Sequence, residues 1–172
     1  MRKTLLAIGC LLLVTLPLTV SAATQVITAT VKFITPISIT NVINASFGYL
    51  TAGVASTTYV MDTAGNITTS SGPGTYITGT KNAASFTITG SPTQTINISS
   101  GLYTAQGGVT PSAATCKYGV AAPVLCDAVA LDTAVAPGAG TPLLIGMTIA
   151  VAANIVEPTT ATPTFTMTIV YN

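Results

Sequence analysis

The sequence contains no histidine and no tryptophan, and charged residues make up only 5% of its 172 residues. Without histidine, a Ser–His or Cys–His catalytic pair cannot form, and a zinc site loses a common nitrogen ligand. Nucleic-acid binding requires several cationic contacts to phosphates, yet beyond residue 3 the chain has three lysines and no arginine. We therefore expect no enzyme, no cofactor, no bound metal and no nucleic-acid partner.

Acidic residues are too few to suggest a catalytic centre. Beyond residue 22 they are Asp62, Asp127, Asp132 and Glu157. Two of the last three could in principle form the carboxylate pair of a glycosidase, and Asp127 with Asp132 could bind calcium. Calcium requires six or more oxygen ligands, however, and the sequence has no acidic cluster. Solvated loop acids are the simpler interpretation.

The N-terminus has the pattern of a secretory signal peptide. Two basic residues precede the apolar run Leu5–Val20, and small residues follow it. This pattern predicts cleavage after Ala22, with Ala23 as the neighbouring alternative. A membrane anchor is disfavoured because the run is short and no stop-transfer pattern follows. We expect residues 1–22 to be removed and residues 23–172 to form a single exported domain.

Two cysteines, Cys116 and Cys126, remain after the predicted cleavage. An even pair in an exported chain predicts a disulfide bond, here with nine residues between the partners. A redox or metal pair is the alternative, but two sulfurs without histidine do not complete a four-ligand zinc site. The disulfide is expected to pin the segment Gly107–Cys126, which has the least regular pattern in the chain.

Threonine supplies 30 of the 150 residues that follow position 22 and alternates with apolar residues. Because side chains of a strand point alternately to opposite faces, this spacing predicts strands with one apolar face. The longest alternating stretches are Gln25–Phe33, Leu143–Val151 and Thr164–Asn172. The predicted strand-pairing interface consists of Ile27, Ala29, Val31, Phe33, Phe165, Met167, Ile169 and Tyr171.

Shorter alternating runs, separated by glycine and proline clusters, predict about eight to ten strands and no helix. The segment Asn66–Gly74 is expected to be an exposed loop or a weak edge strand, and Ala128–Val135 one more strand. The predicted fold is an all-β antiparallel sandwich of immunoglobulin-like or pilin-like type, with Greek-key connections.

Four strand-like motifs appear in a distinctive order. They are Ser46-Phe47-Gly48, Ala84-Ser85-Phe86-Thr87-Ile88-Thr89-Gly90, Ile145-Gly146-Met147-Thr148-Ile149-Ala150-Val151 and the closing Phe165–Asn172. In this order the chain resembles the bacterial exported domain-of-unknown-function family 4402. The resemblance implies a β-sandwich in a cell-surface or extracellular setting, with no catalytic residues to transfer.

The chain is also similar in style to chaperone–usher pilins. It is nearly uncharged and rich in threonine, and Tyr171 is the penultimate residue of an alternating final strand. In those pilins an N-terminal extension of one subunit completes the sheet of the next, which is a form of strand addition at a sheet edge. The similarity implies that Gln25–Phe33 could pair with another copy, and an ordinary first strand within the same sandwich is the alternative. A late disulfide is a departure, since pilins often have theirs early.

These observations predict a bacterial protein that is secreted to the periplasm or cell surface. The leading functional hypothesis is a fimbria-like or self-associating structural subunit without catalytic activity. The expected partners are other copies, through sheet edges, and a periplasmic chaperone. The alternative is a monomeric binding module or adhesin that uses the loops 65–74 and 116–126.

Overall fold

The structure is a computed structural model of the 172-residue chain. It describes residues 25, 27–51, 53, 55–127, 131–156 and 160–172. The predicted signal peptide with Ala22 and Ala23, and the acidic residue Glu157, lie outside the described residues. The chain divides into two compact units, Met1–Lys32 and Phe33–Asn172, and every assigned strand belongs to the second unit.

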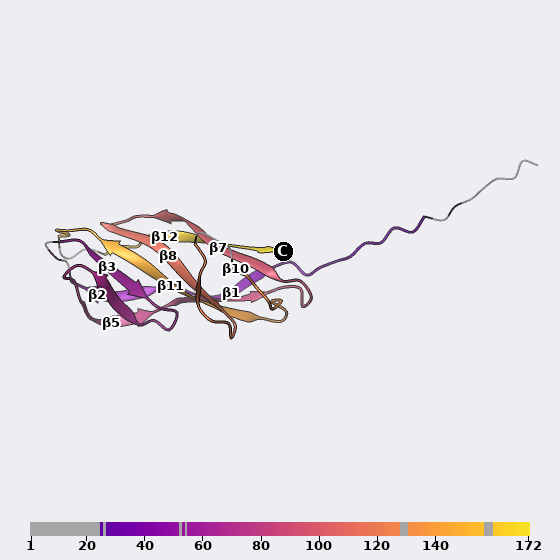
Figure 1. Ribbon diagram of the computed structural model, residues 1–172, viewed down its shortest axis with the longest axis horizontal. Coiled ribbons are helices and arrows are strands. Elements are labelled where there is room, and N and C mark those ends of the chain that lie inside the picture. Colours follow the sequence, from indigo (N-terminus) through magenta and orange to yellow (C-terminus); the bar gives the residue numbers. More distant parts are fainter. Residues whose placement is uncertain (1–24, 26, 52, 54, 128–130, 157–159) are drawn as a thin grey trace, which may run out of the picture. The chain divides into compact units, whose positions relative to one another are not determined.

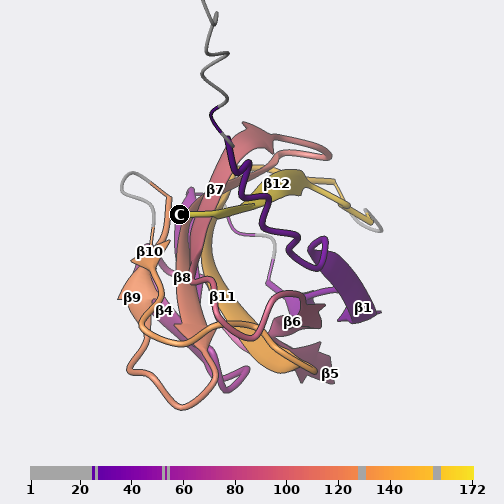
Figure 2. The ribbon, with the colours of Figure 1, turned by 90° about the vertical axis from the view of Figure 1, so that its right-hand side faces the viewer.

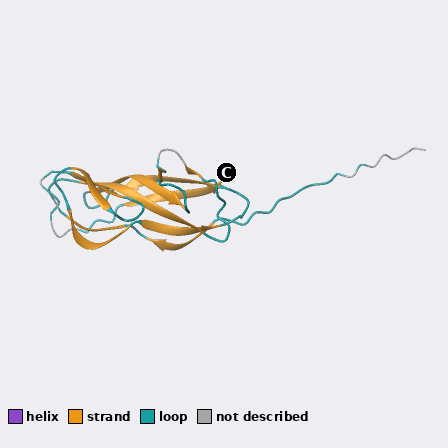
Figure 3. Cartoon of the chain, turned by 60° about the horizontal axis from the view of Figure 1, so that its bottom comes forward, coloured by secondary structure: helices purple, strands orange, loops and turns teal. Residues whose placement is uncertain are grey.

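The unit Phe33–Asn172 is an all-β antiparallel sandwich with no helix among its described residues (Figures 1 and 3). The strands are β1 (Ser38–Ile43), β2 (Ser46–Leu50), β3 (Thr57–Met61), β4 (Ile67–Ser71), β5 (Tyr76–Asn82), β6 (Ala84–Thr89), β7 (Ile96–Thr104), β8 (Val109–Tyr118), β9 (Val124–Leu125), β10 (Leu131–Asp132), β11 (Thr141–Val151) and β12 (Thr164–Tyr171). The fold class is confirmed, although twelve strands exceed the expected eight to ten. Two of them, β9 and β10, have only two residues each.

Strand β11 is the centre of the larger sheet. One of its edges pairs with β8 over nearly its whole length. The other edge pairs first with β6, from Thr141 to Ile145, and then with β3, from Met147 to Val151. The sheet ends at β1 beside β6, at β4 beside β3, and at β9 beside β8. The predicted alternation of Leu143–Val151 is confirmed, because its odd-numbered residues are all buried on one face.

Two smaller sheets cover this buried face of β11. The sheet β10-β7-β12 packs on its first half, where Ile96 and Ile98 join the main core cluster (Figure 2). The two-stranded sheet β2-β5 covers the second half of β11. There, Phe47 and Leu50 pack against the core cluster formed by Tyr59 and the β11 residues Met147, Ile149 and Val151. The second layer of the sandwich is therefore built from two separate pieces.

The segment Gly107–Cys126, which has the least regular sequence pattern, contains a long strand as well as the disulfide-pinned loop. Ten residues of it form β8, a long strand next to β11. A bulge conceals this strand in the sequence, because Ala113 has a φ of 45° and the register with β11 shifts around it. An extra residue in a strand moves the following side chains to the other face, so the alternation is broken at mid-strand.

Other segments differ from their expected structure as well. Within Asn66–Gly74, Ile67–Ser71 is the edge strand β4, which decides between the two alternatives for that segment. In Ala128–Val135 the described strand is β10, and residues 128–130 lie outside the described part. No strand is assigned to the described residues of Gln25–Phe33, where the alternation predicts one.

Candidate strand-accepting groove

The closing strand β12 is at the edge of its sheet. Among the described residues it pairs only with β7. Its outward side chains are exposed, whereas its inward ones, Phe165, Met167, Ile169 and Tyr171, are only half-buried. An apolar strand face inside a fully covered sandwich would be buried. The cover over β12 is therefore incomplete, and alternate backbone N–H and C=O groups on its outer edge are left without a strand partner.

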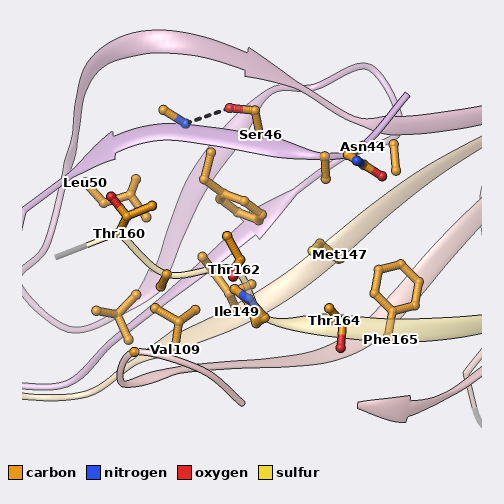
Figure 4. Close-up of a pocket in the computed structure, with 18 of the residues that line it drawn as sticks. Asn44, Ser46, Leu50, Val109, Met147, Ile149, Thr160, Thr162, Thr164 and Phe165 are labelled. Carbon is orange, nitrogen blue, oxygen red and sulfur yellow. Dashed lines mark hydrogen bonds between the residues drawn. The ribbon is translucent and has the colours of Figure 1, made fainter. Parts of the chain in front are cut away.

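A groove of about 760 Å³ lies beside β12 in the sandwich unit. One wall is formed by residues 42–51 of β1 and β2, and the other by residues 160–165 together with Met167 (Figure 4). Its floor consists of apolar side chains from β6 and β11: Ala84, Phe86, Ile145, Met147, Ile149 and Val151. No charged residue lines it. An uncharged apolar channel next to an unpaired strand edge can accept an extended apolar segment.

The β1 wall is shaped by a bulge. Asn41 has a φ of 54°, and the register between β1 and β6 shifts between Thr40 and Ile43. Val42 and Ile43 line the groove, and both remain more than half exposed. Large apolar side chains left uncovered on an edge strand are a liability for a dispersed monomer. Their exposure leaves an uncovered apolar surface along this wall of the groove.

The β12 wall is held to the core through Tyr103 of β7. The Tyr103 ring stacks on Phe165, and its hydroxyl accepts a hydrogen bond from the backbone N–H of Ala114 at 3.1 Å. The segment before β12 is fixed separately, because the N–H of Thr162 donates to Oε1 of Gln106 at 2.6 Å. The wall is thus supported by hydrogen bonds as well as by packing.

The structure brings together only part of the predicted pairing interface. Phe165 and Met167 line the groove, whereas Ile169 and Tyr171 lie beyond its lining. In the N-terminal segment Gln25–Phe33, hereafter the arm, the side chains of Ile27 and Phe33 are 89% and 92% exposed. Ala29 and Val31 are exposed too. The sequence prediction missed the opposite wall at residues 42–51, for which Ser46-Phe47-Gly48 was the available clue.

The predicted disulfide is confirmed. Cys116 and Cys126 are bonded, fully buried, and 5.8 Å apart at their Cα atoms. Backbone hydrogen bonds fix the second cysteine, whose N–H donates to the carbonyl of Ala114 at 3.0 Å. The loop between the cysteines carries exposed apolar side chains, including the fully exposed Val120. The bond therefore anchors an apolar loop to the core.

The described acids have local structural contacts. Asp62 accepts hydrogen bonds from the side chain of Asn66 and from the backbone N–H groups of Asn66 and Ala64, and these lower its pKa against the opposing effect of burial. Asp132 accepts a 2.6 Å hydrogen bond from Asn97. Within the described part of the chain, no group of three or more histidine, cysteine or acidic residues could hold a metal ion.

Comparison with known proteins adds no relative to this picture: no family model, no curated protein and no solved structure matches the chain. The resemblance to domain-of-unknown-function family 4402 therefore stays a prediction. Among the described residues there is no helix long and apolar enough to cross a membrane.

Proposed function

We propose that the chain is an exported, non-catalytic structural subunit that assembles with copies of itself, in the manner of a fimbrial protein. In this proposal the groove beside β12 receives the arm of another copy. The observation that carries the proposal is the coexistence of an apolar groove along an unpaired strand edge with an apolar, alternating segment that forms no strand.

The arm has the chemistry that the groove requires. Ile27, Ala29, Val31 and Phe33 would face the apolar floor, and Thr28, Thr30 and Lys32 would face solvent, because strand side chains alternate. Covering each large apolar side chain contributes roughly 1.5–3 kcal/mol. The single arm charge, on Lys32, falls on the solvent side, so no charge would enter the uncharged groove.

The dimensions also agree. β12 has eight residues, and the arm from Gln25 to Phe33 has nine. At about 3.3 Å per residue they extend over roughly 26 Å and 30 Å. An inserted arm could therefore pair with β12 along its length, and its backbone groups would take up the hydrogen bonds that the edge now lacks.

The same reasoning supports a chaperone as a transient partner. An apolar groove and an exposed apolar arm would promote aggregation if both stayed uncovered at high concentration. A periplasmic chaperone that lends an extended strand to the groove would prevent this until a second copy replaces it. The buried disulfide is compatible with such an oxidising compartment.

The proposal is tested by two neighbouring substitutions in the arm. Val31→Asp puts a charge on the face that would enter the groove, whereas Thr30→Asp puts the same charge on the opposite face. Light scattering and electron microscopy of the chain from residue 23 should show assembly for the parent and T30D, and loss of assembly for V31D.

A second experiment adds a synthetic Gln25–Phe33 peptide to the parent chain. This peptide should stop the growth of assemblies, and the same peptide with the V31D change should not. A parent chain that stays monomeric at high concentration contradicts the proposal.

The alternative function, a monomeric binding module, is favoured by one observation. The disulfide-anchored loop displays Val120, Val124 and Leu125 to solvent, and Lys117 is the single charged residue between the two cysteines. The second predicted loop, 65–74, gives less support, because half of it is strand β4. If the protein is a binding module, Val120→Asp should abolish attachment to the surface that the protein binds, and V31D should leave that attachment unchanged.

A further inference from the structure

Strand β7 has a bulge opposite Phe165 of the groove wall. The register between β7 and β12 shifts there, so that Leu102 and Tyr103 together face the single residue Phe165. Leu102 has a φ of 51°, in the left-handed region that leucine rarely adopts, and its side chain is 80% exposed. The strained backbone and the exposed leucine do not favour folding. Their effect is to turn the next side chain, that of Tyr103, back to the inner face of the sheet beside Phe165.

The Tyr103 hydroxyl belongs to a chain of hydrogen bonds that all point in one direction. It accepts a hydrogen bond from the N–H of Ala114 at 3.1 Å, and it lies 2.8 Å from the hydroxyl oxygen of Ser100. The Ser100 hydroxyl donates its single proton to the carbonyl of Cys126 at 3.1 Å. The proton between the two hydroxyls therefore comes from Tyr103. Successive hydrogen bonds of one direction polarise and strengthen one another.

Backbone hydrogen bonds close this chain into a ring. The N–H of Cys126 donates to the carbonyl of Ala114 at 3.0 Å, and the N–H of Ser100 donates to the carbonyl of Cys126 at 2.7 Å. Ser100, Ala114 and Cys126 are all buried, so an unpaired polar group in the ring would lower stability. Cys126 is itself held by the disulfide bond to Cys116. The ring therefore ties the hydroxyl end of Tyr103 to the part of the core that the disulfide fixes.

The aromatic ring of Tyr103 contacts the groove wall indirectly, through its stack on Phe165. Phe165 lines the groove, whereas Tyr103 does not (Figure 4). Phe165 is only half-buried, and the bulge interrupts the regular pairing of its strand at this residue. Strand pairing alone therefore leaves the Phe165 ring weakly fixed. The stack on Tyr103 supplies the missing constraint, and the ring of hydrogen bonds fixes Tyr103 in turn.

We propose that Tyr103 positions the β12 wall of the groove for strand binding, and that it does so through its hydrogen bonds with Ser100 and Ala114. The inference rests on the proposed function, because it names what keeps the same groove in its strand-accepting form. Tyr103 and Ser100 are positioning residues, since neither lines the groove. A wall that holds this form for only a fraction of the time binds a strand more weakly by that fraction. Because Cys126 completes the ring, the groove should also bind a strand less tightly before the disulfide has formed.

The first test measures the binding of a fluorescent Gln25–Phe33 peptide to the chain from residue 23 that carries V31D, whose groove the proposed function leaves empty. Tyr103→Phe in this chain keeps the stacked ring and removes the hydroxyl, and it should weaken peptide binding by roughly two- to tenfold. Thr133→Val is the matched control. It removes a buried hydroxyl that accepts a 3.0 Å hydrogen bond from the N–H of Ile96, at the other end of β7. Urea unfolding should show a similar loss of stability for both variants, whereas T133V should leave the peptide affinity unchanged.

The second test asks whether the members of the ring act together. Ser100→Ala breaks the same chain of hydrogen bonds, so the double variant S100A/Y103F should bind the peptide about as weakly as the weaker single variant. Separate roles would instead give losses of binding free energy that add. The double variant Cys116→Ala with Cys126→Ala should also bind more weakly, and adding Y103F to it should have little further effect.

The outcomes separate the inference from the proposed function. If the V31D chain binds the peptide and Y103F binds it equally well, the positioning role of Tyr103 is refuted and the proposed function stands. The same conclusion follows if T133V weakens binding as much as Y103F, or if the losses of S100A and Y103F simply add. If the V31D chain does not bind the peptide at all, the proposed function itself fails.

Discussion

The ring of Tyr103 in β7 stacks on the ring of Phe165 in β12, with centroids 5.7 Å apart and planes inclined by 21°. Phe165 packs against both core clusters, and it is also part of the groove wall. This pair therefore ties the unpaired edge of the sandwich to its interior. If β12 receives a partner strand as proposed, its edge must keep its position while it is empty, and the stack supports that position.

Phe165→Ala should destabilise the sandwich by about 2–3 kcal/mol, because a large, half-buried ring and its stacking partner are lost. Val170→Ala is the matched control, since Val170 lies on the same strand with its side chain on the exposed face. It should change the free energy of unfolding by no more than about 0.5 kcal/mol. Urea denaturation measures the free energy of unfolding of both variants. Equal effects would show that Phe165 does not anchor the strand.

Removing the Cys116–Cys126 bond should lower stability by about 2.5–3 kcal/mol, as expected for closing a short loop in the unfolded chain. Thermal unfolding with and without reductant measures the change. The double variant Cys116→Ala with Cys126→Ala is the control, and its midpoint should not respond to the reductant. An unchanged midpoint of the parent under full reduction would mean that β8 and its neighbours hold this region unaided.

Gly146→Ala should be destabilising by more than about 2 kcal/mol, because an added Cβ would overlap the backbone of Met61 and Asp62 in a fully packed strand. Gly101→Ala is the matched comparison in β7, where a Cβ would meet nothing within 4 Å. It should be neutral or slightly stabilising, since glycine is unfavourable within a strand. The two unfolding midpoints, compared in urea, test the packing at β11.

The turn after β3 should give the domain a small acid sensitivity. The hydrogen bonds from Asn66 and Ala64 lower the pKa of Asp62 in the folded state. The contribution of Asp62 to stability is therefore complete above its unfolded-state pKa of about 3.9. That contribution is lost as the pH falls through the lower pKa of the folded state. Because Asp62 is exposed, solvent screening should keep the effect below about 1 kcal/mol.

Asp62→Asn is the comparison for this acid effect, because it keeps one acceptor oxygen and does not titrate. The stability difference between the parent and D62N should shrink as the pH is lowered from about 5 to below 3.9. Unfolding in urea at a series of pH values measures it. A difference that grows toward low pH would contradict the assigned hydrogen bonds.

Sequence pattern alone determined the all-β class, the long strands β11 and β12 and the disulfide, because period-two alternation and paired cysteines are local properties. It placed Phe165 and Met167 on the apolar face of the last strand for the same reason, and both line the groove. Where bulges interrupt the alternation, as at Asn41 and Ala113, the local pattern does not reveal the strand, and β8 is not predicted from it.

Tertiary structure decided where the sandwich is open. The two walls of the groove, 42–51 and 160–167, are separated by more than a hundred residues in the chain. Their separation depends on how β2 and β12 pack on β11, which no local pattern encodes. The hydrogen bond that the Tyr171 hydroxyl donates to the carbonyl of Thr35 is likewise long-range, joining residues 136 positions apart. Alternation tells which face of a strand is apolar, but only the assembled layers show which of those faces is left uncovered.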